Sequence, residues 1–236
     1  MMIKRLALLT LVLSVGMIFA VGCGGGSSSS KTAQLRMVNA VGDSAGYDTL
    51  VAGVSFATDL AFNNATAYAS VTSGSEQIEF RNTGTTTDVI NQTVTLTGAT
   101  NNTYVAMGTS AQPAGAIFTD TSTAATSGDF QLRIINGSTY ISSADVYIVP
   151  STGNCSAGYL SGVSANISGL QFGSASSYQT LTTGSYYLCV TANATKTAYY
   201  YGGSSAYASG AVETIIIEDY GGTGPLQIQT LTDATS

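Results

Sequence analysis

Apolar and polar residues alternate along most of the chain with the period of two that is typical of half-buried β-strands. In residues 76–81, for example, Ile78 and Phe80 alternate with polar side chains, and Gly-containing turns lie on either side. Apolar residues seldom recur at helical spacing for more than one turn, and the frequent Thr, Val, Ser and Gly favour strands and turns over helices. Short strands separated by closely spaced turns predict an all-β sandwich or barrel.

A repeated pattern divides the chain. Gln-Leu-Arg-Met-Val-Asn at residues 34–39 returns ninety-seven positions later as Gln-Leu-Arg-Ile-Ile-Asn at residues 131–136. Later matches, such as Tyr68 with Tyr178, have an offset of 110, which indicates an insertion of thirteen residues in the second copy. We interpret the pattern as a tandem duplication. The predicted units are a β-sandwich at residues 34–120, a linker at 121–129 that is poor in large apolar residues, and a second β-sandwich at 130–236.

The N-terminal segment has the features of an export signal. Lys4 and Arg5 precede an apolar run, which ends in Ala-Val-Gly before Cys23. The run has about the length of a signal peptide and is short for a membrane span. Small residues just before a cysteine resemble the lipobox of bacterial lipoproteins, so residues 1–22 are predicted to be removed and Cys23 to be lipidated. The alternative is an ordinary secretory signal with an unrelated cysteine.

The residues after Cys23 support the lipoprotein interpretation. Residues 24–30 read Gly-Gly-Gly-Ser-Ser-Ser-Ser, a composition that forms flexible tethers, so residues 23–33 are predicted to hold the folded body away from a bilayer. In lipoproteins of this kind, Gly rather than Asp after the cysteine implies the outer membrane. The predicted location is therefore the cell envelope, lipid-anchored at the outer membrane and facing the periplasm or the surface.

The motifs of the two units resemble the bacterial domain-of-unknown-function family 4397. The resemblance rests on Leu-Arg-Ile-Ile-Asn at 132–136, Asp-Val-Tyr-Ile at 145–148, Leu-Gln-Phe-Gly at 170–173, and the stretch from Tyr178 to Gly184. It covers nearly all of residues 34–233, with the first unit more divergent. A histidine of the family pattern is Asn39 and Asn136 here, so no role of that histidine transfers. The resemblance implies two immunoglobulin-like antiparallel β-sandwiches on a secreted or anchored protein, and no established activity.

Charge and composition exclude several functions. Of the seven Lys and Arg residues, two lie in the signal, which leaves five against thirteen Asp and Glu and a formal charge of −8. So acidic a body argues against nucleic acid as a partner, because nucleic-acid binding needs clustered cations. The chain has no histidine, which excludes Ser-His-Asp and Cys-His catalysis and His-ligated metal sites. We predict neither an enzyme nor a cofactor.

Two cysteines remain after lipidation of Cys23, and in an oxidising compartment they are expected to pair. Cys189 aligns with Glu79 of the first unit, so it should lie on the outer face of its strand, opposite Leu188 and Val190. Cys155 lies in the inserted segment. We therefore predict a disulfide between Cys155 and Cys189 that holds the insertion across the outside of the sheet.

A group of tyrosines in the second unit is the candidate binding surface. Tyr199, Tyr200 and Tyr201 are consecutive, and Tyr207 follows after two glycines. Exposed tyrosines provide flat, amphipathic contact area for sugars or proteins. The alternative interpretation is that alternation buries one or two of them and the others line a sheet edge.

Four charged residues are further candidate sites. Arg36 and Arg133 recur at the same place in both units, either as ligand-binding arginines or, as we expect, as outward residues paired with a neighbouring carboxylate such as Asp48 or Asp145. Glu218-Asp219 offers oxygens for calcium but lacks EF-hand spacing, so a solvated turn is expected and no metal site is predicted.

Together these features predict a membrane-anchored cell-envelope lipoprotein with a structural or protein-interaction role. The alternative is a carbohydrate-binding or adhesive surface protein that uses the tyrosine-rich region. The expected partners are the membrane, through the lipid, and a protein or glycan at the cell surface.

Overall fold

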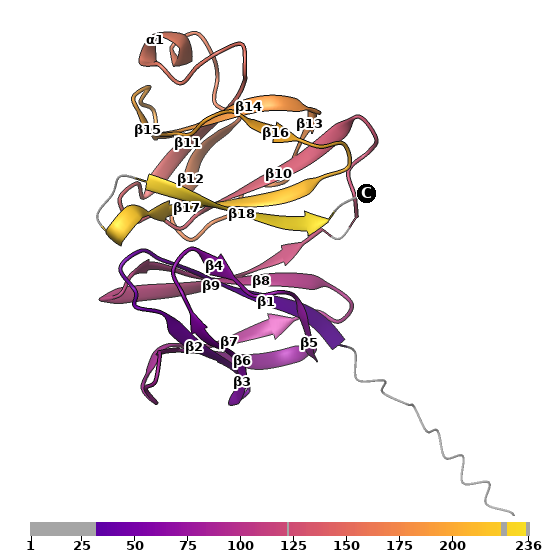
Figure 1. Cartoon of the computed structure of the whole chain (residues 1–236), viewed down its shortest axis with the longest axis vertical. Coiled ribbons are helices and arrows are strands. Elements are labelled where there is room, and N and C mark those ends of the chain that lie inside the picture. The colour runs from indigo at the N-terminus through magenta and orange to yellow at the C-terminus, as the bar shows by residue number, and fades with distance from the viewer. Residues whose placement is uncertain (1–31, 122, 223–225, 235–236) are drawn as a thin grey trace, which may run out of the picture.

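The computed structural model describes residues 32–121, 123–222 and 226–234. These residues form four β-sheets stacked in layers along the long axis of the molecule (Figure 1), which confirms the predicted all-β, sandwich-like fold. Within the described residues, no helix is long and apolar enough to span a membrane. The predicted signal peptide, Cys23 and most of the tether lie outside the described residues.

The first sandwich contains nine strands. One sheet has the order β4-β1-β8-β9, with β5 also paired to β1, and the other has the order β3-β2-β6-β7. The strands are β1 (Thr32–Val41), β2 (Tyr47–Val51), β3 (Val54–Leu60), β4 (Asn64–Ala65), β5 (Ala69–Thr72), β6 (Gly74–Asn82), β7 (Asp88–Leu96), β8 (Asn101–Thr109) and β9 (Gln112–Asp120).

The second sandwich repeats this arrangement. Its sheets have the orders β13-β10-β17-β18 and β12-β11-β14-β15, with β16 also paired to β14. The elements are β10 (Asp129–Asn136), β11 (Ser143–Pro150), α1 (Ala157–Leu160), β12 (Ile167–Gln171), β13 (Gln179–Thr182), β14 (Gly184–Ala192), β15 (Ala198–Tyr201), β16 (Ser205–Tyr207), β17 (Val212–Asp219), the 3-10 turn η1 (Tyr220–Gly222) and β18 (Leu226–Ala234).

The sequence predicts antiparallel sheets, but each sandwich contains one parallel pair of strands. β1 pairs in parallel with β8, and β10 pairs in parallel with β17. Between the two partners the chain passes through the opposite sheet, so it re-enters the first sheet from the same end. Polar and apolar residues alternate in the same way in parallel and antiparallel strands, so the sequence did not reveal these two parallel pairs.

Each sandwich closes its own hydrophobic core. In the first, Phe80 lies between the rings of Tyr47 and Tyr104, at centroid distances of 5.7 and 5.6 Å. In the second, Phe130 stacks on Tyr207 at 4.3 Å. Fully burying each large apolar side chain contributes roughly 1.5–3 kcal/mol, so these clusters provide the main stabilisation of each sandwich.

A third apolar cluster joins the two sandwiches. Val38, Val105 and Met107 of the first pack with Ile135 and Ile216 of the second. These side chains come from the parallel pairs, whose strands are buried on both faces. The sheets β4-β1-β8-β9 and β13-β10-β17-β18 therefore face each other, and the two sandwiches form one four-layered body (Figure 1).

Candidate functional site

The predicted tyrosine group divides between the two faces of its sheet. β15 is an edge strand on β14, and its residues alternate between half-buried and exposed. Tyr199 and Tyr201 point outward and are 41% and 72% exposed, whereas Tyr200 packs against the core. Tyr207 is buried and stacks on Phe130. Tyr200 and Tyr207 therefore do not share an outward surface with Tyr199 and Tyr201, because the period of two turns their rings inward, in agreement with the alternative interpretation.

The structure adds an exposed ring that the sequence analysis missed. Tyr140, in the β10–β11 loop, is 52% exposed, and its ring meets the edge of Tyr199 at a centroid distance of 5.7 Å and an angle of 73°. Edge-to-face contacts of this kind are favourable and restrict both rings. We call Tyr140, Tyr199 and Tyr201 the tyrosine surface.

A buried carboxylate fixes the loop that carries Tyr140. Asp219, at the end of β17, accepts hydrogen bonds from the Ser138 hydroxyl, the Thr139 backbone N–H and hydroxyl, and the Tyr140 backbone N–H. The hydrogen bonds to an ionised acceptor are about twice as strong as neutral ones. The loop is therefore held in one conformation, and Tyr140 is positioned before any partner binds.

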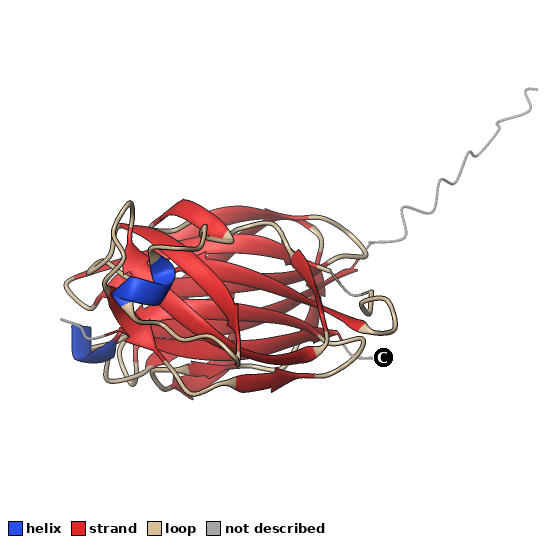
Figure 2. Cartoon of the chain, turned by 90° about the horizontal axis from the view of Figure 1, so that it is seen from above, coloured by secondary structure: helices blue, strands red, loops and turns tan. Residues whose placement is uncertain are grey.

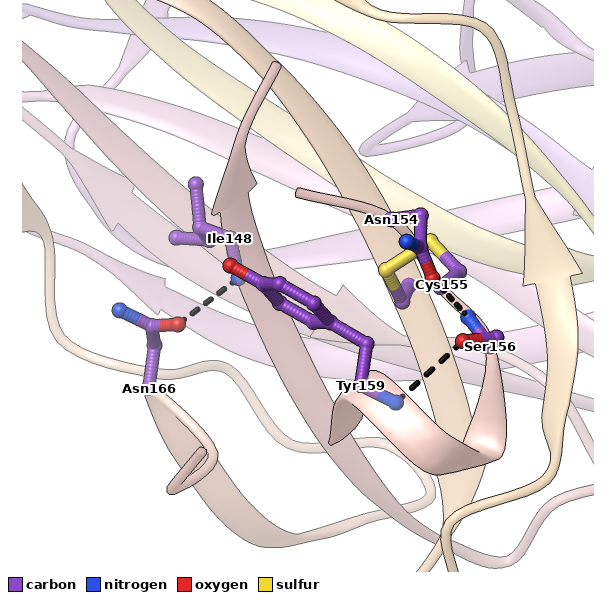
Figure 3. The surroundings of a disulfide bond; sticks show 7 residues. Ile148, Asn154, Cys155, Ser156, Tyr159 and Asn166 are labelled. Carbon is purple, nitrogen blue, oxygen red and sulfur yellow. Dashed lines mark hydrogen bonds between the residues drawn. A yellow bond between two sulfur atoms is a disulfide. The ribbon is translucent and has the colours of Figure 1, made fainter. Parts of the chain in front are cut away.

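The predicted disulfide is present and lies beside the tyrosine surface. Cys155 and Cys189 are bonded, with their Cα atoms 5.5 Å apart (Figure 3). Cys189 lies on the outer face of its sheet, in a cluster with Tyr147, Val149 and Leu160. Seen from above, α1 and its loops lie over this outer sheet (Figure 2). The inserted segment is thus attached across the outside of the sheet.

Hydrogen bonds hold the rest of the insertion in place. The Ser156 side chain caps α1 by accepting from the Tyr159 backbone N–H, and Asn166 accepts from the Ile148 backbone N–H at 2.7 Å (Figure 3). Lys196 donates to the Tyr147 hydroxyl and to the Val163 carbonyl. An open groove remains between the insertion and β15, lined by Asn154, Cys155, Ser156, Ala157, Thr197, Ala198 and Tyr201.

Every cation in the described part of the chain is already engaged. Arg81 pairs with Glu79 and Asp88, and Lys196 binds Tyr147. Arg36 and Arg133, the other two, are buried. The tyrosine surface and its groove consequently present phenols, amides and hydroxyls, and no free positive charge for an anionic ligand.

We expected Arg36 and Arg133 to pair with a neighbouring carboxylate such as Asp48 or Asp145, and this expectation is wrong. Arg36 in the first sandwich pairs with Asp233 in the second, whereas Arg133 in the second pairs with Asp120 in the first. Each arginine also donates to a backbone carbonyl of the other sandwich, at 2.9 Å. The two residues point away from their own cores, but that outer face is buried against the neighbouring domain.

Equivalent side chains surround these two ion pairs, which we call the crossed pairs because each joins one sandwich to the other. Asp120 also accepts from the Tyr68 and Thr103 hydroxyls, and Asp233 accepts from those of Tyr178 and Thr214. Each guanidinium lies over a tyrosine ring of its own sandwich, at 4.7 and 4.8 Å from the centroid. With all polar atoms paired, these residues connect the sandwiches and are not available to bind a ligand.

Glu218 and Asp219 are buried, so the expected solvated turn is wrong. Asp219 is occupied by the loop of Tyr140. Glu218 accepts from Gln227 at 3.0 Å through Oε2, while its Oε1 has no partner among the residues that the structure describes. Burial raises the pKa of Glu218 to about 8. No group of three or more potential metal ligands occurs in the part of the chain that the structure describes.

Asn39 and Asn136, which occupy the same place in the two sandwiches, have a structural role. Both are fully buried, and their amides donate to the carbonyls of Leu60 and Leu170. Each also accepts from a backbone N–H two residues later, so it closes the loop after the first strand of its sandwich.

Comparisons with known proteins agree with the resemblance over part of the chain. The family model "Domain of unknown function (DUF4397)" matches residues 33–147, which include the first sandwich and continue through β10 into β11. A second copy at residues 130–236 stays a prediction. No curated protein matches the chain.

Among solved structures, the chain is similar to "CBMbc (family CBM26) from Eubacterium rectale Amy13K in complex with maltoheptaose". The identity is 11%, the alignment covers 87% of this chain and 97% of that one, and the TM-score is 0.24. Similarity at this level carries no argument about the ligand of this protein.

Proposed function

We propose that this protein is a non-catalytic binding module of the cell envelope, anchored through lipid on Cys23, which presents the tyrosine surface to a protein partner. The observation that carries the proposal is the position of Tyr140 and Tyr199. Two exposed rings from separate elements contact each other, and a buried carboxylate, Asp219, holds one of them in place. Rings that are ordered in advance lose little entropy on binding, which favours affinity.

The arrangement of the sandwiches supports this orientation. The described chain begins at Thr32 in the first sandwich, whereas β15 lies in the outermost sheet of the second, toward the opposite end of the long axis (Figure 1). Packed sheets are about 10 Å apart, and the outermost sheet of the second sandwich lies two layers beyond the sheet that contains β1. The tyrosine surface is therefore about 20 Å from the sheet in which the described chain begins. A lipid on Cys23 would leave this surface directed away from the bilayer.

The likeness between the sandwiches supports a further part of the proposal, that both are copies of one family domain. The strand order is the same, and Arg36 and Arg133 make equivalent contacts. These contacts are too specific to follow from a Ser- and Thr-rich composition alone.

Photocrosslinking in intact cells would test the proposed interaction. A benzophenone amino acid would replace Tyr201, which is 72% exposed, or, as the matched control, Val54 in the first sandwich, which is 70% exposed. We expect a discrete protein adduct from position 201 and none from position 54. Adducts of the same size and yield at both positions, or none at either, would contradict the proposal.

A glycan is the second candidate partner, and the chemistry of the groove favours it. Around Tyr201 the groove offers the Asn154 amide and the Ser156 and Thr197 hydroxyls, without a charged side chain. Sugars bind by stacking on aromatic rings and by hydrogen bonds to such neutral groups.

A glycan array compares the intact protein with a variant in which Tyr140, Tyr199 and Tyr201 are alanine. Tyr200 is left unchanged because it packs against the core. The control is Tyr220→Ala, which removes another exposed ring, 60% exposed, from outside the tyrosine surface. We expect saturable binding that only the triple variant loses. Binding that survives in the triple variant would exclude this surface.

A further inference from the structure

The two sandwiches differ at one edge of their outer sheets. In the first, β7 runs without interruption along β6 from Asp88 to Leu96. In the second, the strand that pairs with β14 is divided into β15 and β16 by residues 202–204, which include Gly202 and Gly203. The interruption leaves a partly enclosed cavity of about 150 Å³ between the two sheets of the second sandwich.

Aromatic and aliphatic side chains line the cavity together with two hydroxyl residues, Ser205 and Thr230, and one acid. Tyr200 and Tyr207 come from the divided strand, and Leu188 and Ile228 come from the two facing sheets. Stacking on Phe130 holds the Tyr207 ring in place. The side chain of Glu213 enters from β17, and its carboxylate has no hydrogen bond or ion pair with a described residue. Burial and the charge of Asp233 raise the pKa of Glu213.

The first sandwich has an amide at the position equivalent to Glu213. Thr103 and Thr214 are equivalent because each binds the arginine of its own sandwich, so the preceding residues, Asn102 and Glu213, are also equivalent. Asn102 is satisfied within the fold, since its amide donates to the Gln34 and Thr100 carbonyls. At the equivalent position of the second sandwich, beside the cavity, stands a carboxylate without a side-chain partner among the described residues.

We propose that this cavity binds a small organic ammonium ion, with Glu213 as the counter-ion and Tyr200 and Tyr207 as the aromatic wall. Aromatic rings and a carboxylate are the groups that recognise alkylammonium ions. A cavity of about 150 Å³ accepts a molecule of about benzene size, so the ligand is limited to a few heavy atoms.

Other classes of ligand fit less well. A calcium ion takes about six to eight oxygen ligands, and Glu213 is the only carboxylate among the described residues that line this cavity. An anion would be repelled by Glu213, and an apolar molecule would leave a partly buried carboxylate without a partner. This site is separate from the tyrosine surface, because Tyr200 and Tyr207 face inward and Tyr199 and Tyr201 face outward.

The proposal can be tested by isothermal titration with choline and tetramethylammonium as probes. The control ligand is the carbon isostere of choline, in which a neutral carbon replaces the charged nitrogen, at the same ionic strength. We expect the ammonium probes to bind and the isostere to bind at least about tenfold more weakly, since it makes neither the charge nor the cation–π contact. Failure of both ammonium probes to bind, or equal binding of the isostere, would overturn the proposal.

Two variants locate the binding. Glu213→Asn introduces the residue of the first sandwich, and Thr230→Phe narrows the cavity without changing its charge. We expect each to lower ammonium affinity by about tenfold or more, while Glu76→Gln, an acid outside the cavity, has no effect. Retained secondary structure and cooperative unfolding would show that the variants are folded. Unchanged affinity in folded Glu213→Asn would refute the assignment of Glu213.

Discussion

The buried acid Glu218 leads to a prediction about stability. Residues at alternate positions of a strand share a face, so Glu218 lies on the same side of β17 as Ile216, at the contact between the sandwiches. Met107 occupies the equivalent position of β8, two residues after Val105. Glu218→Met would therefore introduce a side chain that the first sandwich already accommodates. It would also remove a carboxylate oxygen that has no partner in the described part of the chain.

The magnitude follows from the pKa of Glu218, which burial raises from 4.5 to about 8. Between these values the folded protein holds a proton that the unfolded chain has released, so the free energy of unfolding falls as the pH rises. The loss is about 1.4 kcal/mol per pH unit, or at most about 4–5 kcal/mol across the whole window. Gln227 loses an acceptor in the variant, which costs about 1 kcal/mol at every pH.

The assay is urea unfolding between about pH 5 and pH 8, with the disulfide intact. We expect Glu218→Met to be about 1 kcal/mol less stable than the parent at the acidic end and about 3 kcal/mol more stable at the alkaline end. The chain has no histidine to contribute a slope in this range. Glu76→Gln, the same loss of charge at a partly exposed position, should run parallel to the parent. A parallel profile for Glu218→Met would refute the reasoning.

Three further predictions concern the links between parts of the molecule. Asp120→Asn should lower the free energy of unfolding by about 3 kcal/mol, because it removes the shorter of the two ion pairs of the buried Arg133 and leaves only Asp233 at 4.0 Å. Thermal unfolding of Asp120→Leu/Arg133→Met should show most of that loss recovered. Replacing Cys155 and Cys189 by alanine should lower it by about 3 kcal/mol and expose the inserted segment to proteolysis, as followed by mass spectrometry; equal cleavage of parent and variant would contradict this. Cys23→Ser should move the protein from the membrane fraction to the soluble fraction, and unchanged fractionation would exclude the lipid anchor.

Most of the fold prediction rested on the alternation of polar and apolar residues with a period of two. It placed Ile78 and Phe80 inside, and it placed Cys189 on the face opposite Leu188, where the structure shows the disulfide. Side-chain direction is a local property of a strand, so the sequence contains it.

The alternation pattern could not predict contacts between segments that lie far apart in the sequence. Arg36 was correctly expected to point away from its own core, but its partner Asp233 lies 197 residues further along the chain. An outward face looks the same in the sequence whether it meets water or another domain. For the same reason Glu218 and Asp219, a charged pair at the end of a strand, were expected in solvent and are buried.

Tyr140 shows why the tyrosine surface was only partly predicted. It stands alone in a Ser- and Thr-rich turn, whereas Tyr199, Tyr200 and Tyr201 attract notice as a run. Its relevance depends on Asp219, which is far away in the sequence and fixes the turn next to β15. Spacing within the chain gave no indication of this contact.

The crossed pairs constrain how the sequence of this protein can evolve. Because Arg36 requires Asp233 and Arg133 requires Asp120, a substitution at one of these sites affects the half of the chain in which it did not occur. A polypeptide that consisted of either half alone would expose an arginine and an aspartate without their ion-pair partners on an apolar surface. Two such fragments carry the complementary charges, so they would be expected to reassociate as separate chains, as identical subunits do around a two-fold axis.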